Sequence, residues 1–264
     1  MNDPYDRSQE LLNRILELSK RRSGIQLPVG FVRSRSTTVP PPPLIVMIRG
    51  GRGGEVRLKL YCCLTLLAVD APYSISRHIS ARTWAEMLAL PKPDTNGARR
   101  VSDSLNWLAD NHMVKLERRP SYPPKITMLN PSGDGSPYIR PGSPYVTLSL
   151  GFWQQQWITR LSGTAIALLL ILLDLVGGKT RSPKQFVTTN QRLHYGLSPD
   201  SWTRATRELV DFGLINVDRA IRGGDLESVR ARNFYSVNKE RLNEPSQTLV
   251  TPIGDNAPLH SGSR

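Results

Sequence analysis

The sequence predicts a mainly helical α+β fold made of two similar units in tandem. Residues 58–119 and 163–219 share one order of elements, in which an apolar helix, a second helix and a third helix precede an alternating strand. Laid over each other without gaps, residues 108–118 and 209–219 agree in their apolar positions and share identical Leu, Asp and Arg residues. Because this repeat is far longer than the repeats of solenoids, it indicates two domains.

The first helix of each unit is expected to lie at the back of a small core. "LTLLAVD", residues 64–70, corresponds to "LLLILLD", residues 168–174, and both stretches are apolar on most sides. Each stretch ends at an aspartate, Asp70 or Asp174. Their equivalent positions are typical of helix ends and argue against a pair of catalytic acids.

The third helix of each unit turns directly into apolar alternation. Val114 and Leu116 alternate with polar residues, as Ile215 and Val217 do, which predicts half-exposed strands. The return strands are "KITML" after the turn "PSYPP" and "SVRARNFYSV" after the turn "RGGDLE". Each unit is therefore expected to end in a hairpin beside its third helix.

The N-terminal residues 1–24 are expected to hold an amphipathic helix. One helix side of residues 6–22 collects five apolar residues: Leu11, Leu12, Ile15, Leu16 and Leu18. Asp6 or Ser8 is the expected cap. The apolar side is a candidate surface for a homodimer or for a partner protein.

The rest of the chain divides into four segments. Residues 25–43 lack a period and end in four prolines, which predicts a semi-rigid linker that leaves the N-terminal segment flexible. The first unit, residues 44–144, begins with an expected strand, "LIVMI", and a turn, "RGGRGG", which lacks the lysine of a P-loop. The second unit occupies residues 145–242, and the polar residues 243–264 are expected to be disordered.

An aromatic cluster is expected where the two units join. Three alternating apolar residues predict a strand at the start of the second unit: Val146, Leu148 and Leu150. Three aromatic residues follow: Phe152, Trp153 and Trp157. Core packing between the units is favoured over a dimer surface for these large side chains.

The charge balance indicates a polyanionic partner. The formal net charge is +13 and the isoelectric point about 10.2, which suits nucleic acid or an anionic membrane face. The apolar run 165–176 is shorter than the roughly 20 residues of a membrane span and contains Asp174, and the N-terminus has no signal-like apolar core. We therefore expect a cytoplasmic, nucleoid-associated protein without membrane contact.

The sequence indicates no metal, cofactor or catalytic site. Cys62 and Cys63 are adjacent, which excludes a cross-linked framework and suits a reducing compartment. The four histidines are scattered: His78, His112, His194 and His260. Together with the cysteines they have no metal-ligand spacing. No serine lies in a recognisable nucleophile motif, so we expect a protein that is not an enzyme and needs no cofactor.

One stretch of the second unit carries a family resemblance. "LSPDSWTRATRELVDFGLI", residues 197–215, resembles the recognition helix and first wing strand of bacterial winged-helix DNA-binding proteins. The first unit is similar, with the extra residues "PKPDTN" before its third helix. The resemblance covers residues 55–240 and implies two tandem winged helix-turn-helix domains. Two such domains with a short link are similar to the arrangement in plasmid replication initiators.

The third helix of the second unit, residues 198–211, is expected to read DNA. Ser198 before Pro199 suits an N-cap followed by the first helical position. The expected core side holds Trp202, Ala205, Leu209 and Phe212. The opposite side presents Ser201, Thr203, Arg204 and Arg207. Arginine can donate two parallel hydrogen bonds to guanine, and hydroxyl groups reach phosphates or base edges.

Those two arginines also fit a second interpretation. Arg204 with Glu208 and Arg207 with Asp211 are possible i, i+4 ion pairs. Such pairs contribute only about 0.3–0.5 kcal/mol, which would not keep an arginine from a phosphate.

The equivalent helix of the first unit carries weaker candidates. Its expected core residues are Val101, Leu105 and Leu108, with Trp107 partly packed. The groove side would present Asn96, Arg99, Arg100, Ser102 and Asn106. Asp103 occupies the position of Arg204, and a carboxylate there repels phosphate or accepts from cytosine. The second domain is therefore expected to be the stronger reader.

Both hairpins add basic residues. The first hairpin has Arg118, Arg119 and Lys125, and the second has Arg219, Arg222, Arg230 and Arg232. A basic hairpin beside a recognition helix would lie along the DNA backbone or in the minor groove. The alternative is an edge strand protected by charge.

The function expected from these features is sequence-specific binding of double-stranded DNA by two heads, in a replication initiator of the plasmid or phage type. One alternative is a transcriptional regulator of the winged-helix class. An alternative of another class is a protein-binding tandem winged-helix module of a chromosome-organising complex. Such modules need exposed apolar grooves, whereas both units here carry more basic than acidic residues, which favours DNA.

Overall fold

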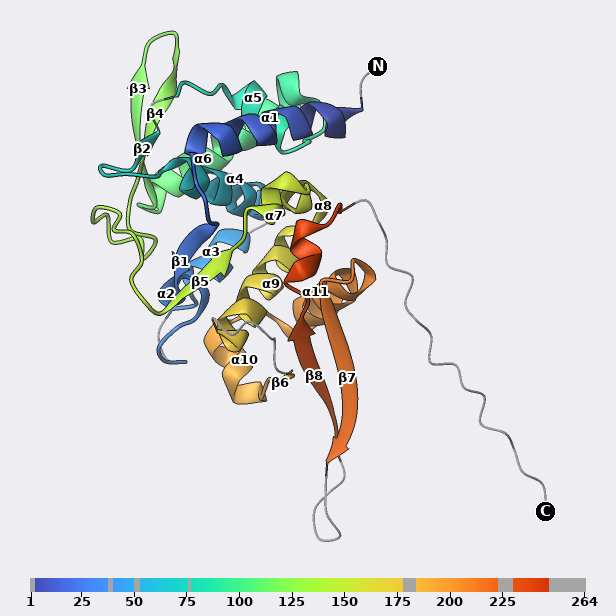
Figure 1. Cartoon of the computed structure of the whole chain (residues 1–264). Helices are drawn as coiled ribbons and strands as arrows, with labels where there is room; N and C mark the ends of the chain where they lie inside the picture. The colour runs from blue at the N-terminus through green and yellow to red at the C-terminus, as the bar shows by residue number, and fades with distance from the viewer. Residues whose placement is uncertain are drawn as a thin grey trace, which may run out of the picture.

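The computed structural model describes residues 3–37, 40–49, 53–75, 77–177, 184–222 and 230–246. Within these residues the fold is mixed, with many helices and three small antiparallel sheets, which confirms the α+β, mainly α class. In Figure 1 helices fill the centre, and two hairpins extend from opposite ends of the molecule.

The first unit runs from one buried helix to the first hairpin. Its elements are α4 (Gly54–Leu67), β2 (Ser74–Ile75), α5 (Ala81–Met87), the π-helical turn η1 (Pro93–Gly97), α6 (Ala98–Asp110), β3 (Val114–Arg119) and β4 (Tyr122–Met128). The strand order in its sheet is β2-β4-β3. Because Arg119 pairs with Tyr122, the hairpin turn is shorter than "PSYPP".

The second unit repeats that order. Its elements are α9 (Gly163–Val176), β6 (Gln185–Phe186), α10 (Thr189–Tyr195), α11 (Pro199–Asp211), β7 (Ile215–Arg222) and β8 (Arg230–Val237). The strand order in its sheet is β6-β8-β7. Both units thus place the first short strand beside the last one, a pairing that alternation alone did not predict.

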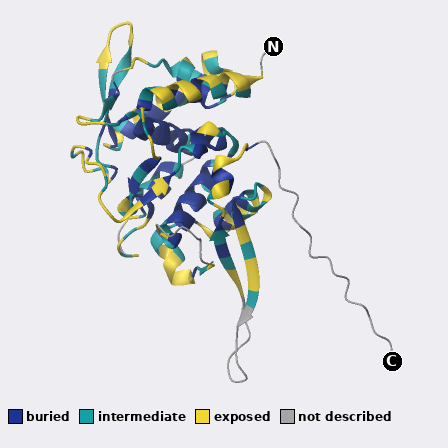
Figure 2. Ribbon diagram, in the orientation of Figure 1, coloured by how far each residue is buried: buried dark blue, intermediate teal, exposed yellow. Residues whose placement is uncertain are grey.

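The core is centred on the first helices of the two units. Nearly every residue of α4 and α9 is buried, and the two helices pack against each other (Figure 2). A Cβ atom at Gly163 would lie 2.9 Å from the Cα atom of Glu55, so only glycine allows this approach. Among the residues that the structure describes, no helix has the length and apolar character needed to cross a membrane.

The N-terminal helix differs from its expected role. The helix α1 (Pro4–Ser19) is capped by Asp3, which accepts from the backbone N–H of Tyr5, so the expected cap at Asp6 or Ser8 is wrong. Pro4 sets the start because its fixed φ suits the first helical turn. The apolar side of α1 is buried against α4, α5 and α7. The surface expected on residues 6–22 for a dimer or partner is therefore used within the chain.

The expected linker, residues 25–43, is folded where the structure describes it. The strand β1 (Ile25–Pro28) pairs antiparallel with β5 (Tyr145–Leu148), and a short helix, α2 (Val29–Val32), follows. The expected strand "LIVMI" is a helix, α3 (Pro43–Ile48), with proline in its first turn. Both predictions were wrong because these segments are too short to show a period, and burial of their apolar residues against α4 and α9 decides their structure.

The junction and the C-terminal end complete the body. The aromatic residues expected to pack in the core are buried in α7 (Gly151–Gln154) and α8 (Trp157–Arg160). A 3₁₀ turn, η2 (Glu240–Asn243), follows β8. Ser246 is buried and its N–H donates to the carbonyl of Gln155 over 3.3 Å, so disorder was wrongly expected for residues 243–246. Residues 247–264 lie outside the described residues.

Candidate nucleic-acid interface

The helix α11 is built as the sequence predicts. The Ser198 hydroxyl caps it by accepting from the N–H of Ser201, and Pro199 takes the first helical position. Three expected core residues are buried and the fourth is half-buried: Trp202, Ala205, Leu209 and Phe212. The Trp202 indole donates to the Tyr235 hydroxyl of β8 over 3.1 Å, which fixes the helix on its sheet.

The outer side of α11 presents two arginines without acidic partners. Arg204 and Arg207 are exposed, and within the described residues neither forms a salt bridge. Glu208, the expected partner of Arg204, instead accepts from the backbone N–H and the hydroxyl of Ser162, both at 2.6 Å. The ion pairs considered from the sequence are therefore not made, and both guanidinium groups face solvent.

The hydroxyl groups on this helix are less free. The Thr203 hydroxyl donates to the carbonyl of Pro199 over 3.0 Å, although the residue is exposed. Ser201 is half-buried and its hydroxyl accepts from Ser198 over 2.9 Å. The basic character of the outer side therefore comes from the arginines.

The second hairpin carries basic residues on different sides of its sheet. Arg219 is exposed and lies two residues after Val217, which packs against the core, so both belong to the sheet side that faces α11. Arg232 is exposed and its guanidinium lies 4.7 Å from the ring centroid of Phe186 in β6. Arg222 and Arg230 are paired in the β7–β8 register, and their side chains lie outside the described part of the structure.

The helix α6 also presents a polar side, with its charges partly compensated. Val101, Leu105 and Leu108 are buried as expected. The groove-side candidates Asn96, Arg99, Ser102 and Asn106 are exposed, and Arg100 is half-buried. Arg99 lies 3.8 Å from Asp103, so the carboxylate that the sequence places in the position of Arg204 offsets a neighbouring arginine.

The first hairpin contacts α6 through one arginine. Arg118 donates to the side-chain oxygen of Asn106 over 2.7 Å, which brings two predicted site residues together. Arg119 is exposed beside the turn. Lys125 lies on the other sheet side, 3.5 Å from Glu117, and its charge is the main cause of the lowered pKa of the Glu117 carboxyl. The structure therefore does not bring Lys125 to the α6 side.

Two arginines that support the third helices were missed by the sequence reasoning. Arg192 of α10 lies 4.7 Å from the Trp202 ring centroid and donates to the Tyr235 hydroxyl over 3.4 Å. Arg57 of α4 lies 4.5 Å from the Trp107 ring centroid. Trp107 is half-buried, as the partial packing predicted for it requires. No spacing in the sequence indicates these pairs, because their partners are remote along the chain.

Two other kinds of group lie among the described residues: possible metal ligands and the two cysteines. No group of three or more His, Cys, Asp or Glu side chains there could hold a metal ion. Cys62 and Cys63 are free and buried, and burial raises the pKa of both thiols, to about 12 for Cys63. Comparisons of the chain with models of protein families, with curated proteins and with solved structures gave no match.

Proposed function

We propose that the chain is a double-stranded DNA-binding protein with two winged-helix heads. Each head comprises one unit, in which a helix-turn-helix pair precedes a hairpin: α5 and α6 before β3–β4, and α10 and α11 before β7–β8. This order of elements allows each head to bind duplex DNA with its third helix in the major groove and its hairpin along the DNA backbone.

One observation carries the proposal. Arg204 and Arg207 project from the outer side of α11 and have no acidic partner among the described residues, and Glu208, the candidate partner of Arg204, is instead bonded to Ser162. Unpaired guanidinium groups on one side of an exposed helix suit phosphate oxygens and guanine edges. The net charge of +13 supports the same class of partner.

A replication initiator of the plasmid or phage type is the role that two DNA-binding heads in one chain favour. A transcriptional regulator would use the same heads at a promoter. The position of the bound site distinguishes the two roles, because an initiator binds at an origin.

The test is selection of duplex DNA from a random pool, with sequencing of the retained molecules across a salt series. The expected result is a motif with two half-sites about one helical turn apart. In the double variant Arg204→Ala/Arg207→Ala, affinity should fall about 100-fold and the magnitude of the salt slope by about 2. The matched control is Arg14→Ala/Arg22→Ala, which removes two exposed arginines outside both third helices.

Each other outcome has a definite meaning. DNA retention that yields no sequence motif and falls steeply as the salt concentration rises would make the protein a non-specific DNA binder. Equal losses in the α11 variant and its control would remove α11 as the reader. No binding at low salt would overturn the proposal and favour the protein-binding module.

A further inference from the structure

The N-terminal segment, residues 3–37 and 40–49, contacts the helix-turn-helix pairs of both units. We call this segment the N-terminal brace. Its helix α3 packs against α4 of the first unit and α9 of the second. Its strand β1 pairs with β5 at the start of the second unit. The brace is thus placed to affect how the two units are held together.

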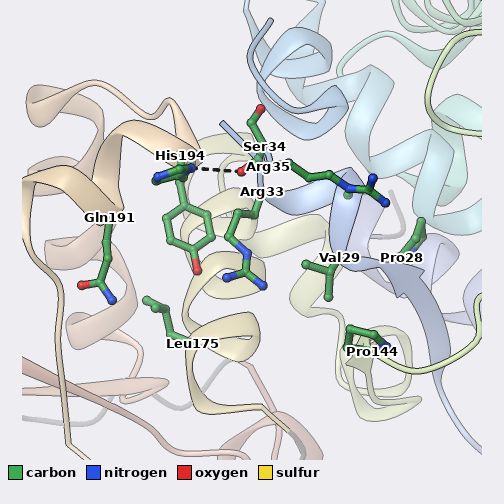
Figure 3. A pocket seen from close by; sticks show the side chains of 11 residues that line it. Pro28, Val29, Arg33, Ser34, Arg35, Pro144, Leu175, Gln191 and His194 are labelled. Carbon is green, nitrogen blue, oxygen red and sulfur yellow. Dashed lines mark hydrogen bonds between the residues drawn. The ribbon is translucent and has the colours of Figure 1, made fainter. Parts of the chain in front are cut away.

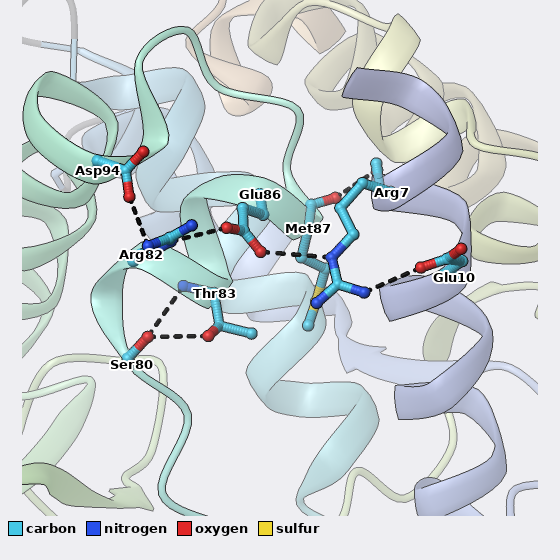
Figure 4. Close-up of polar contacts among 9 residues, drawn as sticks. Arg7, Glu10, Ser80, Arg82, Thr83, Glu86, Met87 and Asp94 are labelled. Atoms are coloured by element: carbon cyan, nitrogen blue, oxygen red, sulfur yellow. Dashed lines mark hydrogen bonds and ion pairs between the residues drawn. The ribbon is translucent and has the colours of Figure 1, made fainter. Parts of the chain in front are cut away.

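In the first unit the brace lies along α5. The buried Ser8 hydroxyl donates to the carbonyl of Met87 over 2.6 Å, and Arg7 lies 3.5 Å from Glu86 (Figure 4). The same Glu86 carboxylate accepts from Arg82 over 2.9 Å, and Arg82 reaches Asp94, in the turn before α6, over 2.7 Å. These contacts join α1 to α5 and to the start of α6.

In the second unit the brace contacts the end of α9 and α10. Arg33 lies 3.3 Å from the Asp174 carboxylate, which is 6% exposed and also accepts from the Tyr195 hydroxyl over 2.8 Å. The N–H of Ser34 donates to the carbonyl of His194 over 2.9 Å. The His194 Nδ1 atom lies 3.1 Å from the carbonyl of Ser34 (Figure 3) and must carry the proton, because a carbonyl only accepts. A pocket of about 600 Å³ lies beside these contacts.

Arg49 links the two units directly. Its guanidinium donates to the carbonyl of Gly196 over 2.8 Å. Gly196 ends α10 with φ 68°, so this bond holds the backbone at the left-handed turn between α10 and α11. The carbonyl of Arg49 accepts from Arg57 of α4 over 3.2 Å, and the Arg57 guanidinium lies over the Trp107 ring of α6. A continuous set of contacts therefore runs from α6 through Arg57 and Arg49 to Gly196, in the turn that precedes α11.

We infer that Arg49, supported by Arg33, is a positioning residue that sets the orientation of α11 relative to α6. On the proposed function, on which this consequence rests, the brace fixes the spacing and phase of the two half-sites in the DNA. The orientation itself is a property of the free protein. It can therefore be measured without DNA, so failure of the inference and failure of the proposed function are distinguishable.

The first experiment measures the distance between α6 and α11 by electron spin resonance. Spin labels are attached at Ser102→Cys and Thr203→Cys, two exposed positions on the outer helix sides. The native Cys62 and Cys63 are buried with raised thiol pKa values and stay unlabelled. The full chain should give one narrow distance distribution, and Arg33→Met/Arg49→Met should make it about twofold wider.

Matched variants separate positioning from charge and folding. Arg22→Met/Arg35→Met removes two exposed brace arginines that form no salt bridge with described residues, and should leave the distribution unchanged. Arg49→Lys keeps a hydrogen-bond donor for the Gly196 carbonyl. Its distance distribution should therefore be nearly as narrow as that of the full chain, and narrower than that of Arg33→Met/Arg49→Met. Helix content by circular dichroism identifies any variant that fails to fold, and for such a variant the single change Arg49→Met replaces the pair.

The second experiment repeats selection from the random duplex pool with unlabelled proteins. Wild type should return one half-site spacing, whereas Arg33→Met/Arg49→Met should return the same half-sites at several spacings. Affinity for a two-half-site duplex should fall roughly tenfold while that for one half-site changes less than about twofold, because a loosened pair of heads has a lower effective concentration. An unchanged distance distribution and unchanged spacing in that variant would overturn the inference and leave DNA binding intact.

Discussion

The two units share their order of elements and differ in how their third helices use charge. On α11 the arginines Arg204 and Arg207 have no acidic partner among the described residues. On α6, Arg99 lies near Asp103, and Asn106 accepts from Arg118 of the hairpin. The second unit therefore offers unpaired cations where the first offers polar groups that already interact.

The equivalent positions Glu208 and Trp107 each contact the first helix of their own unit. Glu208 accepts from Ser162 at the start of α9, so its charge stabilises another helix and leaves Arg204 unpaired. Trp107 instead lies under Arg57 of α4. Both side chains fasten a third helix to its own first helix, one by charge-assisted hydrogen bonds and the other by a cation–π contact. Where a carboxylate is used thus decides which helix retains free positive charge.

The largest expected effect is on the stability of the second unit. Trp202 is 2% exposed and contacts Tyr235 and Arg192, so Trp202→Ala should lower the free energy of unfolding by about 3–5 kcal/mol. Trp107→Ala should cost less because Trp107 is half-buried. Hydrogen exchange of the β7–β8 and β3–β4 amides measures each unit separately. Equal loss of protection in the two variants would contradict this difference between the units.

The next effect, which rests on the proposed function, is on DNA affinity. Arg204→Ala should weaken binding about tenfold, because it removes a guanidinium that the protein leaves unpaired. Arg99→Ala should weaken it less than about threefold, because Asp103 already offsets part of the charge that Arg99 can offer to a phosphate. Fluorescence anisotropy on one duplex, at one salt concentration, compares the two variants. A larger loss for Arg99→Ala would make α6 the stronger reader.

The sequence predicts the third helices well and the N-terminal segment poorly, for a physical reason. Ser198, Trp202 and Leu209 lie within one strongly periodic helix, so local rules are enough to predict its cap and its buried side. By contrast, Arg49 contacts Gly196 and Arg33 contacts Asp174, and no local pattern encodes a partner more than a hundred residues away. The fold class was therefore predictable from the sequence. The contacts of the brace, and the bonding of Glu208 to Ser162 in place of Arg204, could be found only in the structure.

A smaller effect is expected from making the first unit resemble the second. Asp103→Arg places a cation at the position equivalent to Arg204 and removes the carboxylate beside Arg99. Affinity for duplex DNA should rise about threefold to tenfold, with a salt slope steeper by about 1. Asp70→Arg makes the same charge change at an exposed residue after α4 and is the matched control. Equal gains from the two variants would show that net charge, and not α6, is responsible.

The smallest expected effect is in the first hairpin. The pKa of the Glu117 carboxyl is lowered chiefly by the charge of Lys125, and less by Lys115. The interaction between Lys125 and the ionised Glu117 carboxylate stabilises the fold above the ordinary pKa of glutamate. This stabilisation is lost as the pH falls through the lowered pKa of Glu117. Lys125→Met should therefore raise the pKa of Glu117 toward its ordinary value, and Lys115→Met should raise it less. A pH titration of the Glu117 carboxyl carbon by NMR measures both shifts.

On the proposed function, the same NMR signal tests which side of the first hairpin would contact DNA. Glu117 and Lys125 lie on the sheet side opposite Leu116 and Ile126, away from α6. If α6 enters a groove and Arg119 follows the backbone, the Glu117 pKa should stay lowered when duplex DNA is added, because Lys125 remains paired with it. A Glu117 pKa that rises on DNA addition would mean that phosphate has taken Lys125 from Glu117. In that case the outer sheet side, and not the α6 side, would form the interface of the first unit.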